Sequence, residues 1–322
     1  MPIENNNPIS KEIVKNETDN SERMEKSAAL LENPIKDGEI GYDKVFIQAD
    51  SIVQDGNKWQ VNINSEDSTV ILDDKWRKDL GLDASAIVPD IRNGDGTKKL
   101  VSGGTWVWIE NNQGQRFLTL MRRDAGAPVD TNCLTGPAGR CGEKLSKTSV
   151  DETNQELIFL QLEKDGKIKL LAFYRNEEEK EKVVEEKLRQ VGEMYKVLME
   201  KGREEDAKYL ADNIRSGEDI ELLEMGRFED KDSQLDEITM TIDGREVDKV
   251  KGIAYMDEKN KTLEVREVVN IKLPEGVNLA KVMDGEVFLR PTVLVEEGGF
   301  EALKSDDLVP ALRNYVEKVV GK

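Results

Sequence analysis

The chain contains no histidine in its 322 residues and only two cysteines, Cys133 and Cys141. The absence of imidazole excludes Ser–His and Cys–His nucleophilic catalysis and zinc sites with histidine ligands. Two cysteines without histidine partners make a poor zinc site, and they are too few for a disulfide framework, so we expect free thiols in a reducing compartment. Any catalysis must therefore depend on carboxylates, lysine, arginine, tyrosine, the backbone or a metal ion.

Long apolar runs and an excess of positive charge are missing as well. No stretch approaches the roughly 18 apolar residues of a membrane span, and the first residues, MPIENNNPIS, have no signal-peptide core. The 66 acidic residues outnumber the 47 lysines and arginines, which gives a formal net charge of −19. Such a surface repels duplex nucleic acid and anionic membranes. We therefore expect a cytoplasmic protein that binds neither duplex nucleic acid nor a membrane.

The composition changes along the chain. Residues 1–40 are rich in Asn, Glu, Lys and Ser, which is typical of a mobile tail. Short alternating runs in residues 41–103 predict an N-terminal β region. Residues 104–322 mix strand and helix patterns and predict an α/β domain. Within that domain, residues 176–230 change to a charged helical pattern, which we interpret as an inserted helical hairpin.

Local patterns predict several elements of that domain. The runs TWVWIE and FLTLMRR flank the turn NNQGQ, and two further hairpins are predicted to turn at residues 165–166 and 243–244, both Asp-Gly. A closing helix is predicted from about Asp307 to Val320. In the insertion, a stripe with helical spacing consists of Val184, Leu188, Val191, Tyr195 and Leu198. The stripe suits packing on the same domain or on a second subunit, and with the N-terminal β region it is consistent with a homodimer.

Residues 117–160 carry the strongest chemical pattern of the chain, a strand followed by a glycine-rich loop and a short helix. Glu152 and Glu156 lie four residues apart, so a helix places both carboxylates on one face. Glu143 comes just ahead of them in the loop. Carboxylates beside a loop with glycine and arginine suit a hard divalent cation together with a phosphate group.

Structural interpretations of these residues remain open at this point. Ser149 and Glu152 have the spacing of a capping box, so Glu152 alternatively stabilises the start of a helix. Glu156 is alternatively an exposed helix residue. Residues 284–286, Asp-Gly-Glu, alternatively form only a turn.

The segment resembles the Nudix box, whose pattern is G-x5-E-x7-R-E-U-x-E-E-x-G-U. Glu143 takes the first glutamate position, and Glu152 and Glu156 take two of the helical ones. Pro-Ala-Gly-Arg at residues 137–140 resembles the PAG variant of the ADP-ribose pyrophosphatase branch. The resemblance implies an α/β fold, namely a Nudix-like α/β/α sandwich with a mixed sheet, an N-terminal β arm and an inserted helical hairpin.

Candidate roles follow from the chemistry and from this resemblance. Mg²⁺ or Mn²⁺ would be held by Glu152, Glu156 and the Gly139 carbonyl, with Glu143 joining directly or through water. Glu286 resembles the position from which some family members supply a general base. The candidate phosphate ligands are Arg122, Arg123 and Arg140. Since neighbours on a strand point to opposite faces, at most one of the first two reaches the site.

We therefore expect metal-dependent hydrolysis of a phosphoanhydride in a nucleoside diphosphate linked to another moiety, such as ADP-ribose, a dinucleotide or a nucleotide sugar. The box departs from the family pattern at Asp151 and Gln155, where the family has Arg and Glu. These departures favour an alternative, a catalytically impaired Nudix-fold protein that senses or binds a nucleotide and acts through its helical insert. A structural or assembly protein is a third possibility.

Overall fold

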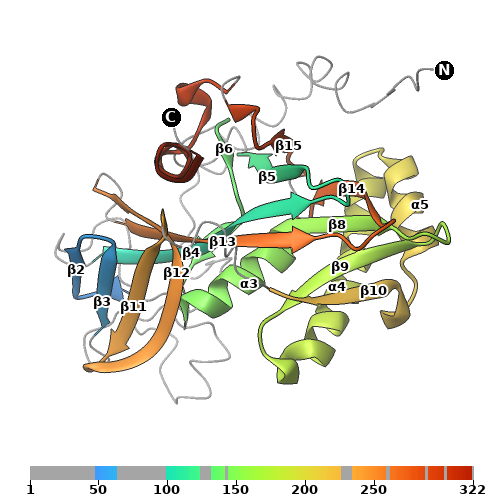
Figure 1. The fold of residues 1–322 in the computed structure, drawn as a ribbon. Coiled ribbons are helices and arrows are strands. Elements are labelled where there is room, and N and C mark those ends of the chain that lie inside the picture. The colour runs from blue at the N-terminus through green and yellow to red at the C-terminus, as the bar shows by residue number, and fades with distance from the viewer. Residues whose placement is uncertain are drawn as a thin grey trace.

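A computed structural model describes residues 48–63, 99–123, 132–141, 144–225, 234–258, 262–286, 289–300 and 303–320. Within these residues the protein is a mixed α/β structure with one large mixed sheet, a second sheet of four strands, and four α-helices (Figure 1). The predicted α/β class with a mixed sheet is therefore confirmed. The predicted tail at 1–40, much of the predicted β region at 41–103, and Glu143 lie outside the described residues.

The large sheet contains a parallel pair at its centre. Its strands are β1 (Gln48–Ala49), β2 (Ser51–Asp55), β3 (Lys58–Ile63), β4 (Lys99–Glu110), β5 (Arg116–Arg122), β6 (Leu134–Thr135), β7 (Ala138–Arg140), β11 (Asp236–Ile242), β12 (Arg245–Asp257), β13 (Thr262–Lys272) and β15 (Thr292–Glu296). The main order is β15-β5-β4-β13-β12-β11-β3-β2, while β1 and β7 pair with β4 and β6 pairs with β5. Strands β4 and β13 are parallel, as are β3 and β11. The β2–β3 hairpin thus extends the sheet at its edge.

The second sheet lies against one face of the first. Its strands are β8 (Leu157–Leu162), β9 (Ile168–Tyr174), β10 (Ile220–Glu224) and β14 (Asn278–Asp284), in the order β10-β9-β8-β14. Side chains of β8 alternate between two cores. Leu157 and Phe159 pack with the large sheet, whereas Ile158 and Leu160 pack with the helical insertion. Both faces of β8 are therefore apolar because both are covered.

Helices lie on both outer sides of the paired sheets. The predicted helical insertion at 176–230 forms α4 (Lys180–Glu200) and α5 (Glu204–Asn213), which pack on β8 and β9 of the same chain. The prediction is wrong for residues 220–224, which form β10 because they pair with β9. On the other face of the large sheet, α6 (Pro310–Tyr315) packs against Trp106 and Trp108, and the indole of Trp108 donates a 2.6 Å hydrogen bond to the Tyr315 hydroxyl. Between the two sheets, α3 (Leu145–Glu156) contacts β4 and continues into β8 without a loop (Figure 1).

The predicted hairpins are confirmed by the strand register. Glu110 pairs with Arg116 across the first turn, and the turns at 165–166 and 243–244 join β8 to β9 and β11 to β12. Asp243 and Gly244 both have positive φ, 50° and 75°, as a tight hairpin turn with strand-like twist requires. The closing helix begins at Pro310 rather than at about 307, since proline is favoured in a first helical turn, and it continues as a π-helix over Val316–Val320.

The predicted stripe of α4 is shifted by one residue over most of its length. The buried side chains of this helix are Val183, Lys187, Val191, Met194 and Leu198. The prediction is right for Val191 and Leu198 but wrong for Tyr195, whose residue surface is 37% exposed. Lys187 lies outside the predicted stripe, yet its side chain is buried and points toward α3.

Two further expectations bear on the chemistry. Cys133 and Cys141 are free thiols, as predicted. In the part of the chain that the structure describes, no helix has both the length and the apolar character needed to cross a membrane.

Candidate functional site

The carboxylate helix α3 is positioned by distant parts of the chain. It begins at Leu145 after Lys144, whose side chain makes no capping bond, so the capping-box interpretation of Ser149 and Glu152 is wrong. Instead, Asp248 of β12 accepts a 2.9 Å hydrogen bond from the backbone N–H of Ser146, which places an anion at the positive end of the helix. Glu152 is therefore not needed to start the helix.

Glu152 lies against Gly139, the middle residue of the short strand β7. A Cβ atom on Gly139 would lie 2.0 Å from the Oε1 atom of Glu152, so the carboxylate occupies the space that any other residue would fill. The backbone of β7 and of the residue before it is held by side chains from two other strands. Ser102 Oγ donates a 2.8 Å hydrogen bond to the Gly139 carbonyl, and the Nη1 atom of Arg266 donates a 2.9 Å bond to the Pro137 carbonyl. The glycine loop and the helix thus meet at the predicted place.

Glu156 is buried on the same side of α3. Its residue surface is 7% exposed, so the interpretation of Glu156 as an exposed helix residue is wrong. Its Oε2 atom accepts a 3.2 Å hydrogen bond from the backbone N–H of Ala138. Burial raises the pKa of Glu156 to about 8, the charge of Arg290 opposes this rise, and the negative charges of Glu286 and Glu152 add to it. The carboxyl group therefore holds a proton near neutral pH unless more positive charge is supplied.

Arg290 connects Glu156 with the loop after β14. Its Nη1 atom lies 3.8 Å from Glu156 Oε1, and its Nη2 atom lies 3.0 Å from Glu286 Oε2. Asp284 receives two hydrogen bonds from the same guanidinium, 3.1 Å from Nε and 3.0 Å from Nη2. Burial would lower the pKa of Arg290, but the bond to Asp284 and the charge of Glu156 raise it above its ordinary value. Arg290 is thus a fixed cation among three acidic side chains.

The structure brings together part of the predicted set. Glu152, Glu156 and Gly139 converge as predicted, and Glu286 joins them through Arg290. The backbone N–H of Glu286 also donates a 3.2 Å bond to Asp284, so residues 284–286 form a turn as well as a side of the site.

The three arginines predicted as phosphate ligands lie at or just after the ends of β5 and β7. Arg122 ends β5 and its Nη1 atom donates a 2.5 Å hydrogen bond to the Asn132 carbonyl. Arg123 donates its backbone N–H to the Cys133 carbonyl, and Arg140 is exposed at the end of β7. The prediction missed Arg290, for which the sequence offers a weak signal, namely an arginine shortly after the Asp-Gly-Glu turn.

The oxygen donors of Glu152 and Glu156 suit a hard divalent cation. Among the described residues, no three Asp, Glu, His or Cys side chains form a group ready to hold a metal ion. Glu143, the further predicted ligand, lies outside that part of the chain. The two buried carboxylates are nevertheless oxygen donors of the kind that Mg²⁺ prefers. Burial raises the pKa of Glu156, and a bound cation would favour the ionised form of this carboxyl group.

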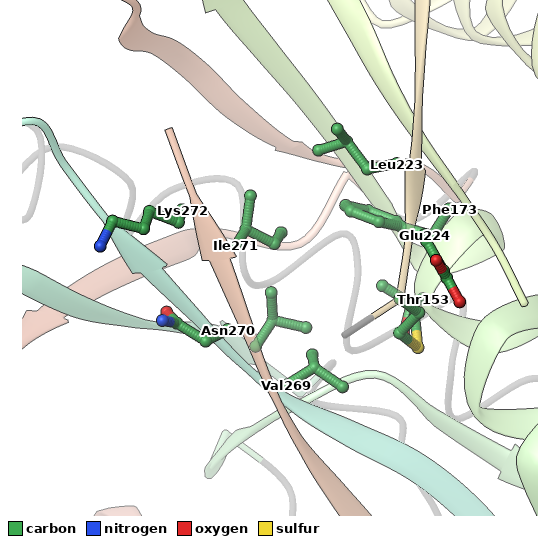
Figure 2. Close-up of a pocket in the computed structure, with 10 residues that line it drawn as sticks. Thr153, Phe173, Leu223, Glu224, Val269, Asn270, Ile271 and Lys272 are labelled. Atoms are coloured by element: carbon green, nitrogen blue, oxygen red, sulfur yellow. The ribbon is translucent and has the colours of Figure 1, made fainter. Parts of the chain in front are cut away.

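A cavity lies between the two sheets, and neither Glu152 nor Glu156 lines it. It measures about 160 Å³, and its lining is Val107, Thr153, Phe173, Leu223, Glu224, Met225, Val269, Asn270, Ile271 and Lys272. Figure 2 shows Val269 and Ile271 on the side nearer Phe173 and Leu223, while the polar ends of Asn270 and Lys272 point away. Those two polar ends bind Glu110 instead. The cavity is therefore mainly apolar and offers little for a phosphate.

Comparison with models of protein families, with curated proteins and with solved structures gives no match for this chain. The interpretation of the site accordingly depends on its geometry and on the residues named above.

Proposed function

We propose that the chain is a Nudix-type hydrolase that uses Mg²⁺ or Mn²⁺ to cleave a phosphoanhydride in a nucleoside diphosphate linked to another moiety. One observation carries this proposal. Glu152 and Glu156 share one face of α3 beside Gly139, and Arg290 joins Glu156 to Glu286 from a distant loop. In metal-assisted hydrolysis of a phosphate ester or anhydride, a carboxylate pair on one helix face can hold the metal ion and a third acidic residue can act as general base.

The fold supports the same proposal. A mixed sheet with a parallel central pair and a helix that follows β7 are compatible with the Nudix-like arrangement expected from the sequence. The second sheet adds a layer to that arrangement, because β8 and β9 lie between the large sheet and α4. Fold alone does not define a reaction, so the proposal depends on the residues of the site.

The cation would be held by Glu152 and Glu156 together with the Gly139 carbonyl, and Glu143 is a further candidate. When bound, it supplies positive charge to the phosphate oxygens and polarises the attacking water. Glu286 is suited to accept the proton of that water because 35% of its side chain is exposed and its carboxylate is held by Arg290. Asp284 keeps Arg290 in place through the paired hydrogen bonds, which fixes the direction in which Glu286 points.

The direct test is nucleotide hydrolysis with Mg²⁺ or Mn²⁺, using ADP-ribose, NAD, dinucleoside polyphosphates, nucleotide sugars and nucleoside triphosphates. Glu156→Gln should abolish metal-dependent turnover, since it removes an anionic oxygen ligand. Glu193→Gln is the matched control, because Glu193 is an exposed helical glutamate. Absence of metal-dependent turnover on every substrate, with folded wild-type protein, would contradict the proposal.

A second candidate is a nucleotide-binding protein with impaired hydrolysis that acts through the helical insert. Arg290 favours it, because this internal cation lies 3.8 Å from Glu156 and takes part of the charge-balancing role of a metal. In that case a nucleotide would raise the melting temperature without a divalent cation, and no product would form. Strict dependence of nucleotide binding on the cation would favour the hydrolase instead.

A further inference from the structure

The end of the carboxylate helix is held by a side chain from the insertion. The last carbonyl groups of an α-helix have no partner within the helix. Here Lys187 of α4 donates to the carbonyl of Asn154, and its Nζ atom lies 3.0 Å from the carbonyl oxygen of Leu157, directly after the helix. A cation at this position also complements the negative end of the helix dipole. Lys187 therefore fixes the turn of α3 that carries Glu156.

One turn further along α4, Gln190 links this helix end to the Glu286 loop. Its Nε2 atom donates a 2.6 Å hydrogen bond to the carbonyl of Gln155 and a 3.1 Å bond to that of Gly285. Its Oε1 atom accepts a 2.9 Å bond from Lys187. The two side chains thus form one connected unit between α3 and the loop after β14.

Gly285 shows how close the loop must come to α3. Its backbone N–H donates a 2.8 Å hydrogen bond to the carbonyl of Glu156. A Cβ atom at this position would lie 2.4 Å from the Gln155 carbonyl oxygen and 2.5 Å from Gln190 Nε2. The loop therefore passes α3 at a distance that leaves no room for a side chain, with Asp284 and Glu286 on either side of the contact.

We propose that Lys187 and Gln190 are positioning residues that fix the placement of Glu156 relative to Glu286. This inference deepens the proposed hydrolase function and rests on it. Neither residue is expected to touch the substrate, since both act through backbone carbonyl groups. The insertion is then a structural part of the site, and its role is to hold two acidic residues from distant segments in one arrangement.

Burial of the Lys187 ammonium group is unfavourable, and its three hydrogen bonds offset this cost. Burial lowers the pKa of Lys187 to about 7, because a buried ammonium group loses its hydration. The three bonded acceptors are two backbone carbonyls and the amide oxygen of Gln190, which together match the three protons of an ammonium group. A hydrophobic residue at this position would leave the carbonyls of α3 without this donor.

The variants Lys187→Met and Gln190→Leu test the inference, with Lys182→Met as the matched control, because the Lys182 side chain on the same helix is 69% exposed. We expect kcat to fall roughly 10- to 100-fold while KM stays close to the wild-type value, since small misplacement of reacting groups has effects of this size. Lys187→Arg keeps a donor cation and should recover part of kcat. Unchanged kcat in both variants, or a loss that Lys182→Met shares, would overturn the inference.

A second measurement separates this inference from the proposed hydrolase function. Hydrogen exchange of the Gly285 amide in the cation-free protein reports the contact with Glu156 directly, whether or not any substrate is hydrolysed. Gln190→Leu should accelerate this exchange and leave the amides of α5 unchanged. If wild-type protein hydrolyses nothing, the function fails while the exchange still tests the contact. If Lys187→Met does not fold, the half-buried Gln190 still provides the test, and unchanged Gly285 exchange in Gln190→Leu would refute the positioning role.

Discussion

Arg290 and Glu156 form an ion pair between the loop after β14 and the end of α3, with Nη1 and Oε1 separated by 3.8 Å. Both side chains are largely buried, with 12% and 10% of their surfaces exposed. The guanidinium also binds Asp284 and Glu286, so one positive charge balances several negative ones. This relationship makes the charge state of the site depend on groups that are far apart in the sequence.

Replacement of Arg290 should therefore destabilise the protein strongly. Arg290→Gln leaves the buried carboxylate of Asp284 without its cation, and breaking a buried pair in this way typically costs about 3–5 kcal/mol. Arg189→Gln is the control, because the pair of Arg189 with Glu193 is exposed and such pairs contribute about 1 kcal/mol or less. Urea unfolding at neutral pH measures the loss of unfolding free energy in each variant. Equal losses of unfolding free energy in the two variants would show that the buried pair contributes no more stability than the exposed pair.

Glu156 should make the stability of the cation-free protein fall as pH rises. The pKa of this carboxyl group is about 8 in the folded protein against an ordinary value of 4.5. Between these values the unfolded chain loses a proton that the folded chain keeps, so the group's contribution is complete below pH 4.5 and is lost as pH rises toward 8. The slope from this one group is at most about 1.4 kcal/mol per pH unit.

The difference between wild type and Glu156→Gln isolates this effect, because all other groups titrate in both proteins. Unfolding free energies between pH 5 and pH 9, measured with a chelator present, should decline more steeply in the wild type than in the variant. Parallel curves would mean that Glu156 is ionised in the folded protein at neutral pH.

Several features of the fold could be predicted because they are local. Asp-Gly turns predict hairpins at 165–166 and 243–244, and the four-residue spacing of Glu152 and Glu156 predicts a shared helix face. These patterns depend on a few neighbouring residues. The elements they predict are accordingly those that the structure confirms most closely.

The parts that could not be predicted depend on contacts between distant segments. A lysine in a charged helix normally faces solvent, so nothing in the local pattern indicates that Lys187 binds the carbonyls of α3. Arg290 enters the site because β14 pairs with β8, and that pairing is not visible in the residues around 290. The start of α3 was likewise missed, because Asp248 comes from another strand.

Gly139→Ala should damage the cation site while leaving the fold largely intact. The added methyl group would lie 2.0 Å from the carboxylate oxygen of Glu152, so Glu152 must move. Mn²⁺ affinity, measured by electron paramagnetic resonance, should fall at least tenfold. Gly192→Ala on α4 is the matched control, since its Cβ would meet no atom within 4 Å and alanine favours a helix interior by roughly 1 kcal/mol. Wild-type Mn²⁺ affinity in Gly139→Ala would remove Glu152 from the proposed ligand set.

Glu286→Gln should separate proton transfer from cation binding. If Glu286 accepts the proton of the attacking water, its amide variant should lose roughly 10²- to 10⁴-fold in kcat and retain Mn²⁺ affinity. Glu152→Gln should instead lose Mn²⁺ affinity, because Glu152 lies against Gly139, whereas Glu286 is the residue that pairs with Arg290. Glu275→Gln serves as the control, since Glu275 is exposed just before β14. A Glu286→Gln protein that loses Mn²⁺ but keeps turnover at saturating metal would identify Glu286 as a ligand and leave the general base to another residue.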